Sequence, residues 1–228
     1  MTKGKLFVIE GTDASGKETQ TRMLLKRLTS EGIPAQSMSF PRYHTPTGRI
    51  IAGPYLGKED FGRSYFPNGA DLVHPEVASL YFAADRRDAR DEMLGIIDSG
   101  KHLILDRYVP SNMAHQGGKI EDNQERENLY EFLDTLEHKL LKLPRPDGAV
   151  ILYVPVEITK NLIKTRGSSD GHESSEVHLT RAEKAYRTLV SFYKIKWGII
   201  DCTRENKMRT TEDIHEEVFE FFKEILNQ

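Results

Sequence analysis

The chain has 228 residues, of which 38% are hydrophobic and 29% charged, so we expect one folded domain with a large core. Its formal net charge of −3 argues against a general surface for nucleic acids or membranes, and its longest strongly apolar stretch, AVILYV, is far below the roughly 20 residues that span a bilayer. The single cysteine, Cys202, excludes an intramolecular disulfide and fits a reducing, cytoplasmic compartment.

The first predicted elements are a short strand and a helix. Residues 6–10, LFVIE, predict a buried strand, and residues 19–32 predict a helix that ends at Gly32. The next β-rich run, residues 35–40, leads into a segment punctuated by Pro and Gly. That segment, residues 41–74, predicts loops and short turns.

A long helix and a second buried strand come next. The helix is expected from Pro75 to about Gly100. HLILD, residues 102–106, predicts a strand, and leucines together with Phe132 at helical spacing predict a helix over 129–141, before Pro144. The first apolar stripe of the long helix is formed by Val77, Leu80, Tyr81 and Ala84.

The last third of the chain contains the only segment that we expect to be mobile. Residues 148–156 predict a strand and residues 157–166 a helix. Residues 167–179, GSSDGHESSEVHL, are polar with almost no apolar residues, and they predict a mobile lid.

The remaining elements complete an alternation of strands and helices. Residues 180–193 predict a helix opened by a capping box, Thr180 to Glu183, and residues 197–201 a final strand. Such alternation predicts crossover connections and one doubly wound α/β domain over 1–228, whose parallel sheet of about five strands is flanked by helices. The closing helix carries an apolar stripe formed by Ile214, Val218, Phe221, Phe222 and Ile225.

Residues 11–19, GTDASGKET, come close to the phosphate-binding pattern of Gly, four residues, Gly, Lys, and Ser or Thr. The segment follows the first strand and opens the first helix, where glycines let backbone N–H groups wrap around a phosphate. Lys17 would then reach the β- and γ-phosphates of ATP, whereas the alternative is an ordinary glycine turn. The predicted ATP-binding residues of this loop are Gly11, Thr12, Asp13, Ala14, Ser15, Gly16, Lys17, Glu18 and Thr19.

Glu18 stands where the pattern has the hydroxyl that ligates Mg²⁺. Two like charges about 4 Å apart cost about 4 kcal/mol at an effective dielectric near 20, so Glu18 beside ATP is favourable only if it helps to hold the metal. We therefore predict Glu18, through a water, and Asp106 as the metal-binding residues. The alternative is that Glu18 faces solvent and Mg²⁺ relies on the phosphates, waters and Asp106.

Asp106 and Arg107 end the buried strand at 102–106. In an open parallel sheet, ligands bind outside the carboxyl ends of the strands, next to the phosphate loop. The acid can organise Mg²⁺ there, and the arginine can clamp a phosphate with two parallel hydrogen bonds. A structural ion pair between the two is the alternative.

The chain resembles thymidylate kinases over essentially its whole length. The motifs are Phe40-Pro41, FAADR at 82–86, DRYVPS at 106–111 followed by AHQGGK, then RG…GHE, and the terminal W-x-x-I-D. The resemblance implies a fold of the P-loop NTPase type and the reaction ATP + dTMP → ADP + dTDP, on the way to dTTP. It also implies Mg²⁺ as the cofactor, small-molecule substrates and a homodimer.

The resemblance implies that Phe82 stacks on thymine, that Arg86 binds a carbonyl of the ring and that Gln116 reads the base. Phe82 and Arg86 are one helical turn apart and so share a face, although a second packing face is the alternative for Phe82. Arg107 would clamp the acceptor phosphate. The predicted dTMP site comprises Phe40, Pro41, Arg42, Arg49, Phe82, Arg86, Arg107, Ser111, His115 and Gln116.

This chain departs from the family pattern at two positions of the acceptor site. Arg42 follows Pro41 directly, and Tyr43 occupies the usual place of an arginine, so Arg42 or Arg49 would be the second phosphate contact. His115 stands where many members have an aromatic residue that helps to exclude a ribose 2′-hydroxyl. This substitution weakens the expected discrimination between dTMP and UMP.

On the donor side, the resemblance implies that Asp13 lies near the transferring group and that Arg166 flanks adenine. Neither the phosphate loop nor residues 168–179 carry an arginine, yet charge on the transferring phosphoryl group needs neutralising. Arg166 and Arg181 are therefore the candidate lid cations, with His172 a weaker third. The predicted catalytic residues are Asp13, Lys17, Asp106, Arg107 and Arg181.

Three other functions are alternatives to this one. A deoxynucleoside kinase needs a carboxylate base after the second strand, where this chain has FPRYH. A regulatory GTPase needs an N-K-x-D motif, and NKMR at 206–209 lacks the acid. Glu18 and the lid without arginines would also suit a nucleotide-binding homologue that has lost catalysis.

Overall fold

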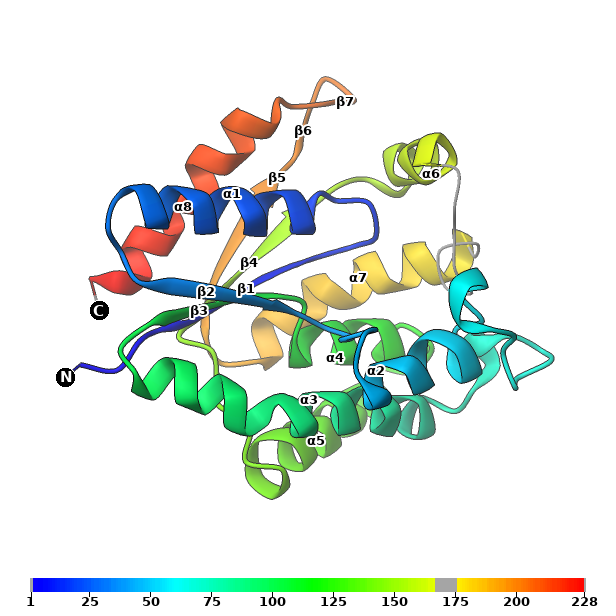
Figure 1. The fold of residues 1–228 in the computed structure, drawn as a ribbon. Coiled ribbons are helices and arrows are strands. Elements are labelled where there is room, and N and C mark those ends of the chain that lie inside the picture. The colour runs from blue at the N-terminus through cyan, green and yellow to red at the C-terminus, as the bar shows by residue number, and fades with distance from the viewer. Residues whose placement is uncertain (1, 167–175, 228) are drawn as a thin grey trace.

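The computed structural model describes residues 2–166 and 176–227, without the side chains of 164–166 and 176–178. At its centre is a parallel sheet with the strand order β2-β3-β1-β4-β5, which confirms the predicted doubly wound α/β fold with five strands (Figure 1). The strands are β1 (Leu6–Gly11), β2 (Ala35–Ser39), β3 (His102–Asp106), β4 (Gly148–Tyr153) and β5 (Lys196–Asp201).

The sheet is covered on both faces, as the apolar strands require. Successive residues of β1 point to opposite faces, so that Leu6 and Val8 enter one core and Phe7 and Ile9 the other. In Figure 1, α1 and α8 lie above the sheet, and α3, α4, α5 and α7 lie below it. The bounds of these helices are α1 (Lys17–Ser30), α8 (Thr211–Leu226), α3 (Pro75–Asp98), α4 (Val109–Gly117), α5 (Asn123–Asp134) and α7 (Glu176–Phe192).

A third apolar cluster lies between the amino end of α3 and the segment before it. The prediction of only loops and short turns over 41–74 was wrong for residues 46–55, which form helix α2 (Pro46–Ile50) and a wider π-helical turn (Ile51–Tyr55). The hydroxyl of Thr45 accepts a hydrogen bond from the Gly48 amide at 3.2 Å, which caps α2. Two single turns follow, Glu59–Phe61 and Ala70–Leu72.

The predicted apolar stripe of α3 was also wrong. Val77 and Leu80 are 44% and 48% exposed, Ala84 is exposed, and only Tyr81 is partly buried. The buried face instead combines small and apolar side chains with charged ones whose partners lie on other elements, so a search for hydrophobic spacing selects the wrong side. It consists of Ala78, Ser79, Ala83, Asp85, Arg86, Ala89, Met93 and Ile97.

The region after β3 contains a helix that the sequence did not predict. Helix α4 starts with Pro110 in its first turn and is buried over almost its whole length, so it shows no amphipathic period. The predicted helix at 129–141 begins six residues earlier, where Asp122 caps α5 by accepting from the Glu125 amide at 2.9 Å. It continues as a π-helical segment, Thr135–Leu140.

Two other helix boundaries and one apolar stripe differ from the predictions. Helix α1 begins at Lys17 rather than at Thr19, and α7 begins at Glu176, so Thr180 lies inside a helix and does not cap one. Residues 176–179 of the predicted lid are therefore helical, and residues 167–175 lie outside the described part of the chain. In α8, Phe219 is buried where the predicted stripe had Phe221, which is only partly buried.

The remaining elements are helix α6 (Val156–Arg166) and a small hairpin of β6 (Thr203–Arg204) and β7 (Lys207–Met208). No helix within residues 2–166 and 176–227 is long and apolar enough to cross a membrane. Both ends of the chain lie at the amino edge of the sheet, whereas the loops after the strands gather at the opposite edge (Figure 1).

Candidate active site

The loop between β1 and α1 needs glycine at two positions. Gly16 has φ of 88°, in the left-handed region. At Gly11, a Cβ would lie 2.6 Å from the carbonyl oxygen of Leu152, so β4 passes too close for a side chain. No side chain in the described chain caps the amino end of α1, so its first amides point into the loop and offer an anion site.

Lys17 lies folded over this loop. Its Nζ donates to the carbonyl oxygen of Thr12 at 2.6 Å and to the Ser15 hydroxyl at 3.4 Å. Burial, together with the nearby Arg107 charge, lowers the pKa of Lys17 to about 8, against the opposing effects of Asp13 and Asp106. A phosphate in the loop would return the pKa of Lys17 toward its ordinary value, because an anion favours the charged amine.

Arg107 connects the phosphate loop to α4. The residue has a left-handed φ of 67°, and its guanidinium forms an ion pair with Asp13. It also donates to the Ser111 hydroxyl at 3.2 Å and lies 3.1 Å from His115 Nε2. Burial by itself lowers the pKa of Arg107, but Asp13 and the other nearby acids outweigh it and raise that pKa above its ordinary value.

Glu10 is a buried acid beneath the loop that the sequence reading missed. Its carboxylate accepts from the amides of Tyr108 and Ser111 at 2.9 and 3.1 Å, and from the hydroxyls of Ser111 and Tyr186 at 2.6 and 2.9 Å. Burial raises the pKa of Glu10 against these hydrogen bonds. A charged residue inside an otherwise apolar strand, just before the loop glycine, was the available signal.

A pocket opens beside the loop, between the segment that follows β2 and the helices α3 and α4. It is lined by Asp13 and by eight of the predicted dTMP-binding residues, which are Phe40, Pro41, Phe82, Arg86, Arg107, Ser111, His115 and Gln116. The other lining residues are Tyr43, Leu56, Tyr108 and Asn112. The structure thus brings the predicted site together, except for Arg42 and Arg49.

The pocket wall contains buried polar atoms that have no protein partner within the described chain. These are Nε2 and Oε1 of Gln116 and Oδ1 of Asn112. The amide of Asn112 is oriented by donating to the carbonyl oxygen of Ser79 at 3.2 Å and to Glu137 at 3.1 Å. Since buried polar groups are normally hydrogen-bonded, these atoms indicate a ligand with donors and acceptors of its own.

Arg86 is fixed by a buried acid that the sequence reading also missed. Its guanidinium donates to both carboxylate oxygens of Glu137, at 2.5 and 2.7 Å, and both side chains are buried. Burial lowers the pKa of Arg86, but the charge of Glu137 outweighs this effect and raises it. An arginine on the buried side of a helix requires such a partner.

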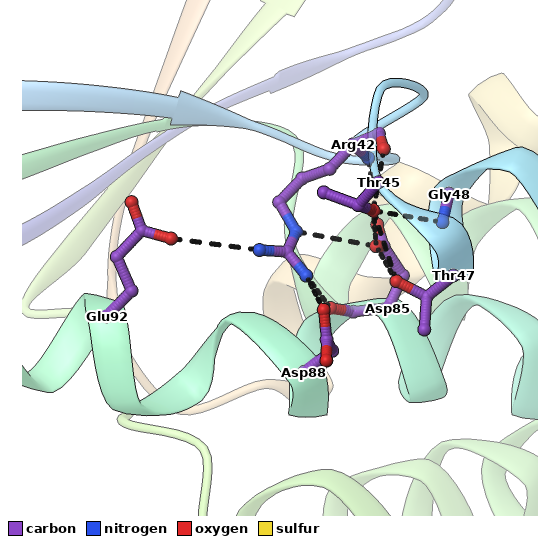
Figure 2. A network of polar contacts seen from close by, with 7 residues as sticks. All are labelled: Arg42, Thr45, Thr47, Gly48, Asp85, Asp88 and Glu92. Atoms are coloured by element: carbon purple, nitrogen blue, oxygen red, sulfur yellow. Dashed lines mark hydrogen bonds and ion pairs between the residues drawn. The ribbon is translucent and has the colours of Figure 1, made fainter.

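The two remaining predicted dTMP residues lie elsewhere. The side chain of Arg42 turns toward α3 and contacts Asp85, Asp88 and Glu92 (Figure 2). Arg49 is exposed on α2. Tyr43 lines the pocket instead, at the position that the sequence comparison had marked as a departure.

Glu18 and Asp106 line a second pocket, on the side of the loop that faces Arg42. Burial raises the pKa of Asp106, and Lys17 and Arg107 oppose the rise. Residues 2–166 and 176–227 contain no cluster of three or more acids, histidines or cysteines that could hold a metal alone. Two carboxylates beside a phosphate loop nevertheless fit Mg²⁺, which takes one or two carboxylates together with substrate phosphates and waters.

Helix α7 presents different cations on its two sides. Arg181 donates to Glu121 at 2.9 Å in a pocket with Gly118 and Lys184, away from the phosphate loop. Arg187, which the sequence reading missed, lines a pocket with the loop residue Thr12 and donates to the Tyr153 hydroxyl at 2.9 Å. The side chains of Arg166 and His172 lie outside the described part of the structure.

Comparisons with known proteins agree on one family. A family model described as thymidylate kinase matches residues 9–218. The thymidylate kinase of Plasmodium falciparum is 28% identical over 217 residues, covering 95% of this chain and 88% of the relative. The human thymidylate kinase is 26% identical over 218 residues, with the same two coverages of 95% and 88%. A solved thymidylate kinase from Candida albicans matches with a TM-score of 0.75 and 22% identity, covering 99% of this chain and 93% of that one, which supports the fold.

Proposed function

The chain belongs to the thymidylate kinase family, and from that premise we propose that it transfers the γ-phosphoryl group of ATP to dTMP, giving dTDP for dTTP synthesis. The fold is of the P-loop NTPase type. The observation that carries the proposal is the contact between Asp13 and Arg107, because it lies where the phosphate loop meets the pocket of the acceptor. A donor phosphate on one side of this contact and an acceptor phosphate on the other would lie close enough for direct transfer.

At the donor end, the amides of α1 and the amine of Lys17 would bind the β- and γ-phosphates. Glu18 and Asp106 are the residues that would hold Mg²⁺, which neutralises phosphate charge when it is bound. Support comes from their position in one pocket beside the loop and from their hard oxygen donors.

At the acceptor end, Phe82 would stack on thymine, while Gln116, Asn112 and Arg86 would bind the edge of the ring. The unpartnered amide atoms of Gln116 and Asn112 support this role, because the edge of thymine offers both a donor and acceptors. Arg107 would then exchange part of its contact with Asp13 for the phosphate of dTMP.

The reaction needs no general base. The acceptor phosphate has a second pKa of about 6 and is therefore largely dianionic at neutral pH. Catalysis then consists of alignment and charge stabilisation by Lys17, Arg107 and a further cation. We propose Arg181 as that cation, since its side chain is 45% exposed and its partner Glu121 is 85% exposed, and such a surface pair is easily released.

The proposal is tested by measuring ADP release with dTMP, dUMP, UMP and thymidine as competing acceptors. We expect dTMP to give the highest kcat/KM, and thymidine to give none above background. Asp13 is the one acid that lines the pocket in the described structure, and Arg107 already engages it, which disfavours a deoxynucleoside kinase. Faster turnover of thymidine than of dTMP would overturn the proposal.

Two further properties belong to the same proposal. A homodimer is supported by the exposed apolar side chains of Val77 and Leu80 on α3. A cytoplasmic, reducing location is supported by Cys202, a free thiol that is fully buried and whose pKa is raised to about 12 by that burial.

A further inference from the structure

We propose that Asp85 is a positioning residue for the acceptor site, because its buried carboxylate fixes the segment 40–48 against α3. This inference rests on the proposed function, since the wall that it would position lines the dTMP pocket. Neither Asp85 nor its partners touch that pocket themselves. The arrangement is shown in Figure 2.

Asp85 collects its donors from a single loop. Oδ2 accepts from the backbone amide of Arg42 at 2.8 Å, and Oδ1 accepts from the hydroxyls of Thr47 and Thr45 at 2.7 and 3.3 Å. The carboxylate is only 1% exposed, so these contacts replace its hydration. Asp85 therefore holds the loop by its backbone and by two hydroxyls near the start of α2.

The guanidinium of Arg42 is a second connection between the same loop and helix. It donates to the Asp85 carboxylate at 3.4 Å, to the Asp85 carbonyl oxygen at 3.2 Å and to Asp88 at 2.5 Å. Asp88 is half exposed and contacts only the guanidinium, whereas Asp85 contacts the loop backbone as well. Asp85 is thus the residue on which the position of the loop depends.

The neighbours of this contact line the acceptor pocket. On the loop side, Phe40, Pro41 and Tyr43 flank Arg42, and on the helix side Phe82 and Arg86 flank Asp85. Arg42 lines the second pocket and not the acceptor pocket, so its contact with Asp85 lies outside the acceptor pocket. This contact consequently sets the distance between the pocket wall formed by residues 40–43 and helix α3, which carries Phe82.

The loop is also closely packed around the same point. A Cβ at Gly48 would lie 1.9 Å from the carbonyl oxygen of Arg42, so the loop folds back onto the residue whose amide Asp85 accepts. A loop that is held in this way needs no ordering when the acceptor binds, which favours affinity for that substrate. The hydrogen bonds that hold the Asp85 carboxylate come from Arg42, Thr45 and Thr47, and in the described chain none comes from the phosphate loop. ATP binding should therefore not depend on Asp85.

The test compares Asp85→Ala with Asp88→Ala as the matched control. For Asp85→Ala we expect KM for dTMP to rise by ~10-fold or more, because the acceptor wall loses its support. KM for ATP should stay within ~2-fold of wild type, because Asp88 and Glu92 still hold the Arg42 guanidinium beside the second pocket. Asp88→Ala should change neither constant by more than ~2-fold. Asp85→Asn, which keeps one oxygen for the Arg42 amide, should restore part of the affinity for dTMP.

Hydrogen exchange of the peptide 40–50 provides a readout that needs no substrate. The amides of Arg42 and Gly48 should exchange faster in Asp85→Ala and at the wild-type rate in Asp88→Ala. If Asp85→Ala does not fold, Thr47→Val replaces it, with an expected ~3-fold rise in KM for dTMP and faster exchange of the same peptide.

Two results would overturn the inference. One is wild-type KM for dTMP in a folded variant whose loop exchanges faster, and the other is an equal rise of KM for ATP. If the wild-type protein does not phosphorylate dTMP, the proposed function fails, and the exchange measurement alone then decides about Asp85. If the peptide 40–50 of Asp85→Ala then exchanges at the wild-type rate, Asp85 does not hold the loop.

Discussion

At the scale of single residues, Lys17 has a lowered pKa before any nucleotide binds. Its amine is buried beside Arg107, and this lowers its pKa to about 8. Neutral backbone and hydroxyl acceptors hold it over the loop. The amine is therefore ready to bind phosphate, but part of it is uncharged at mildly alkaline pH.

This pKa predicts how ATP binding depends on pH. Between about pH 7 and 9.5, the free protein loses the Lys17 proton, whereas bound phosphates favour the charged amine. Binding must then take up a proton, so the affinity for ATP should fall as the pH rises above about 8. Calorimetric titration in buffers of different ionisation enthalpy measures that uptake directly.

Lys17→Arg is the control for this prediction, because a guanidinium stays protonated throughout the range. Its affinity for ATP, though weaker, should no longer fall with pH and its binding should take up no proton. Proton uptake that persists unchanged in Lys17→Arg would assign the effect to another group.

Gln116 leads to a second prediction at this scale. Its two amide atoms are buried without a protein partner in the described chain, which costs stability in the absence of a ligand. Gln116→Leu should therefore leave the melting temperature unchanged or higher, while KM for dTMP rises by ~10-fold or more. A lower melting temperature with an unchanged KM would show that the amide has a structural role instead.

At the scale of elements, helix α7 separates its cations between two sides. Arg181 lies toward Gly118 and Glu121, whereas Arg187 lies toward Thr12 and Tyr153. Arg187 donates to the Tyr153 hydroxyl, lies over the Tyr153 ring with its guanidinium carbon 5.0 Å from the ring centroid, and pairs with Glu183. The exposed pair of Arg181 with Glu121 is weak and leaves that side chain free to move.

Arg181→Ala should accordingly lower kcat by ~100-fold with both KM values within ~3-fold, since a lid cation acts on the transferring phosphoryl group. Glu121→Gln should leave kcat unchanged or slightly higher, because it releases Arg181. Wild-type turnover in Arg181→Ala would exclude this residue, and a large loss in Arg187→Ala would then assign the role to Arg187.

The sequence predicted the strands and the phosphate loop because their signals are local. The strands β1, β3 and β4 contain continuous apolar runs, and the loop requires glycines at fixed spacing. Helix α4 was missed because it is buried on nearly all sides, and the stripe of α3 was misplaced because Asp85 and Arg86 lie on its buried face. Their burial depends on Arg42 and Glu137, which are 43 and 51 residues away along the chain.

The same limit applies to the site. Phe82, Arg107 and Gln116 were found because their motifs are contiguous, and the pocket brings them together. Glu10, Asn112 and Glu137 act through contacts that only the folded chain creates. Arg42 was predicted from the sequence to bind a phosphate, but in the structure it contacts acids. Residue spacing along the chain does not contain that information.

At the scale of the whole molecule, the exposed apolar side chains of α3 predict an interface between two copies. Val77 and Leu80 lie three residues apart on one face, with the exposed Ala84 a turn further on. Light scattering should give about twice the 26.1 kDa of one chain for the wild type. Leu80→Glu should lower this mass toward a monomer, since a buried unpaired charge is costly at an interface.

Glu76→Gln, on the same helix but polar and exposed, is the control and should keep the wild-type mass. A wild-type protein that scatters as a monomer at micromolar concentration would contradict the predicted interface. A Leu80→Glu variant that keeps the double mass would place the interface elsewhere.

The two chain ends lie at the edge of the sheet opposite the phosphate loop (Figure 1). A purification tag, a fluorescent fusion or a tether to a sensor surface can thus be joined to either end with the nucleotide pockets still open to solvent. Immobilised protein should bind ATP as well as protein in free solution does, and a pair of dyes at the two ends would report on unfolding without disturbing catalysis.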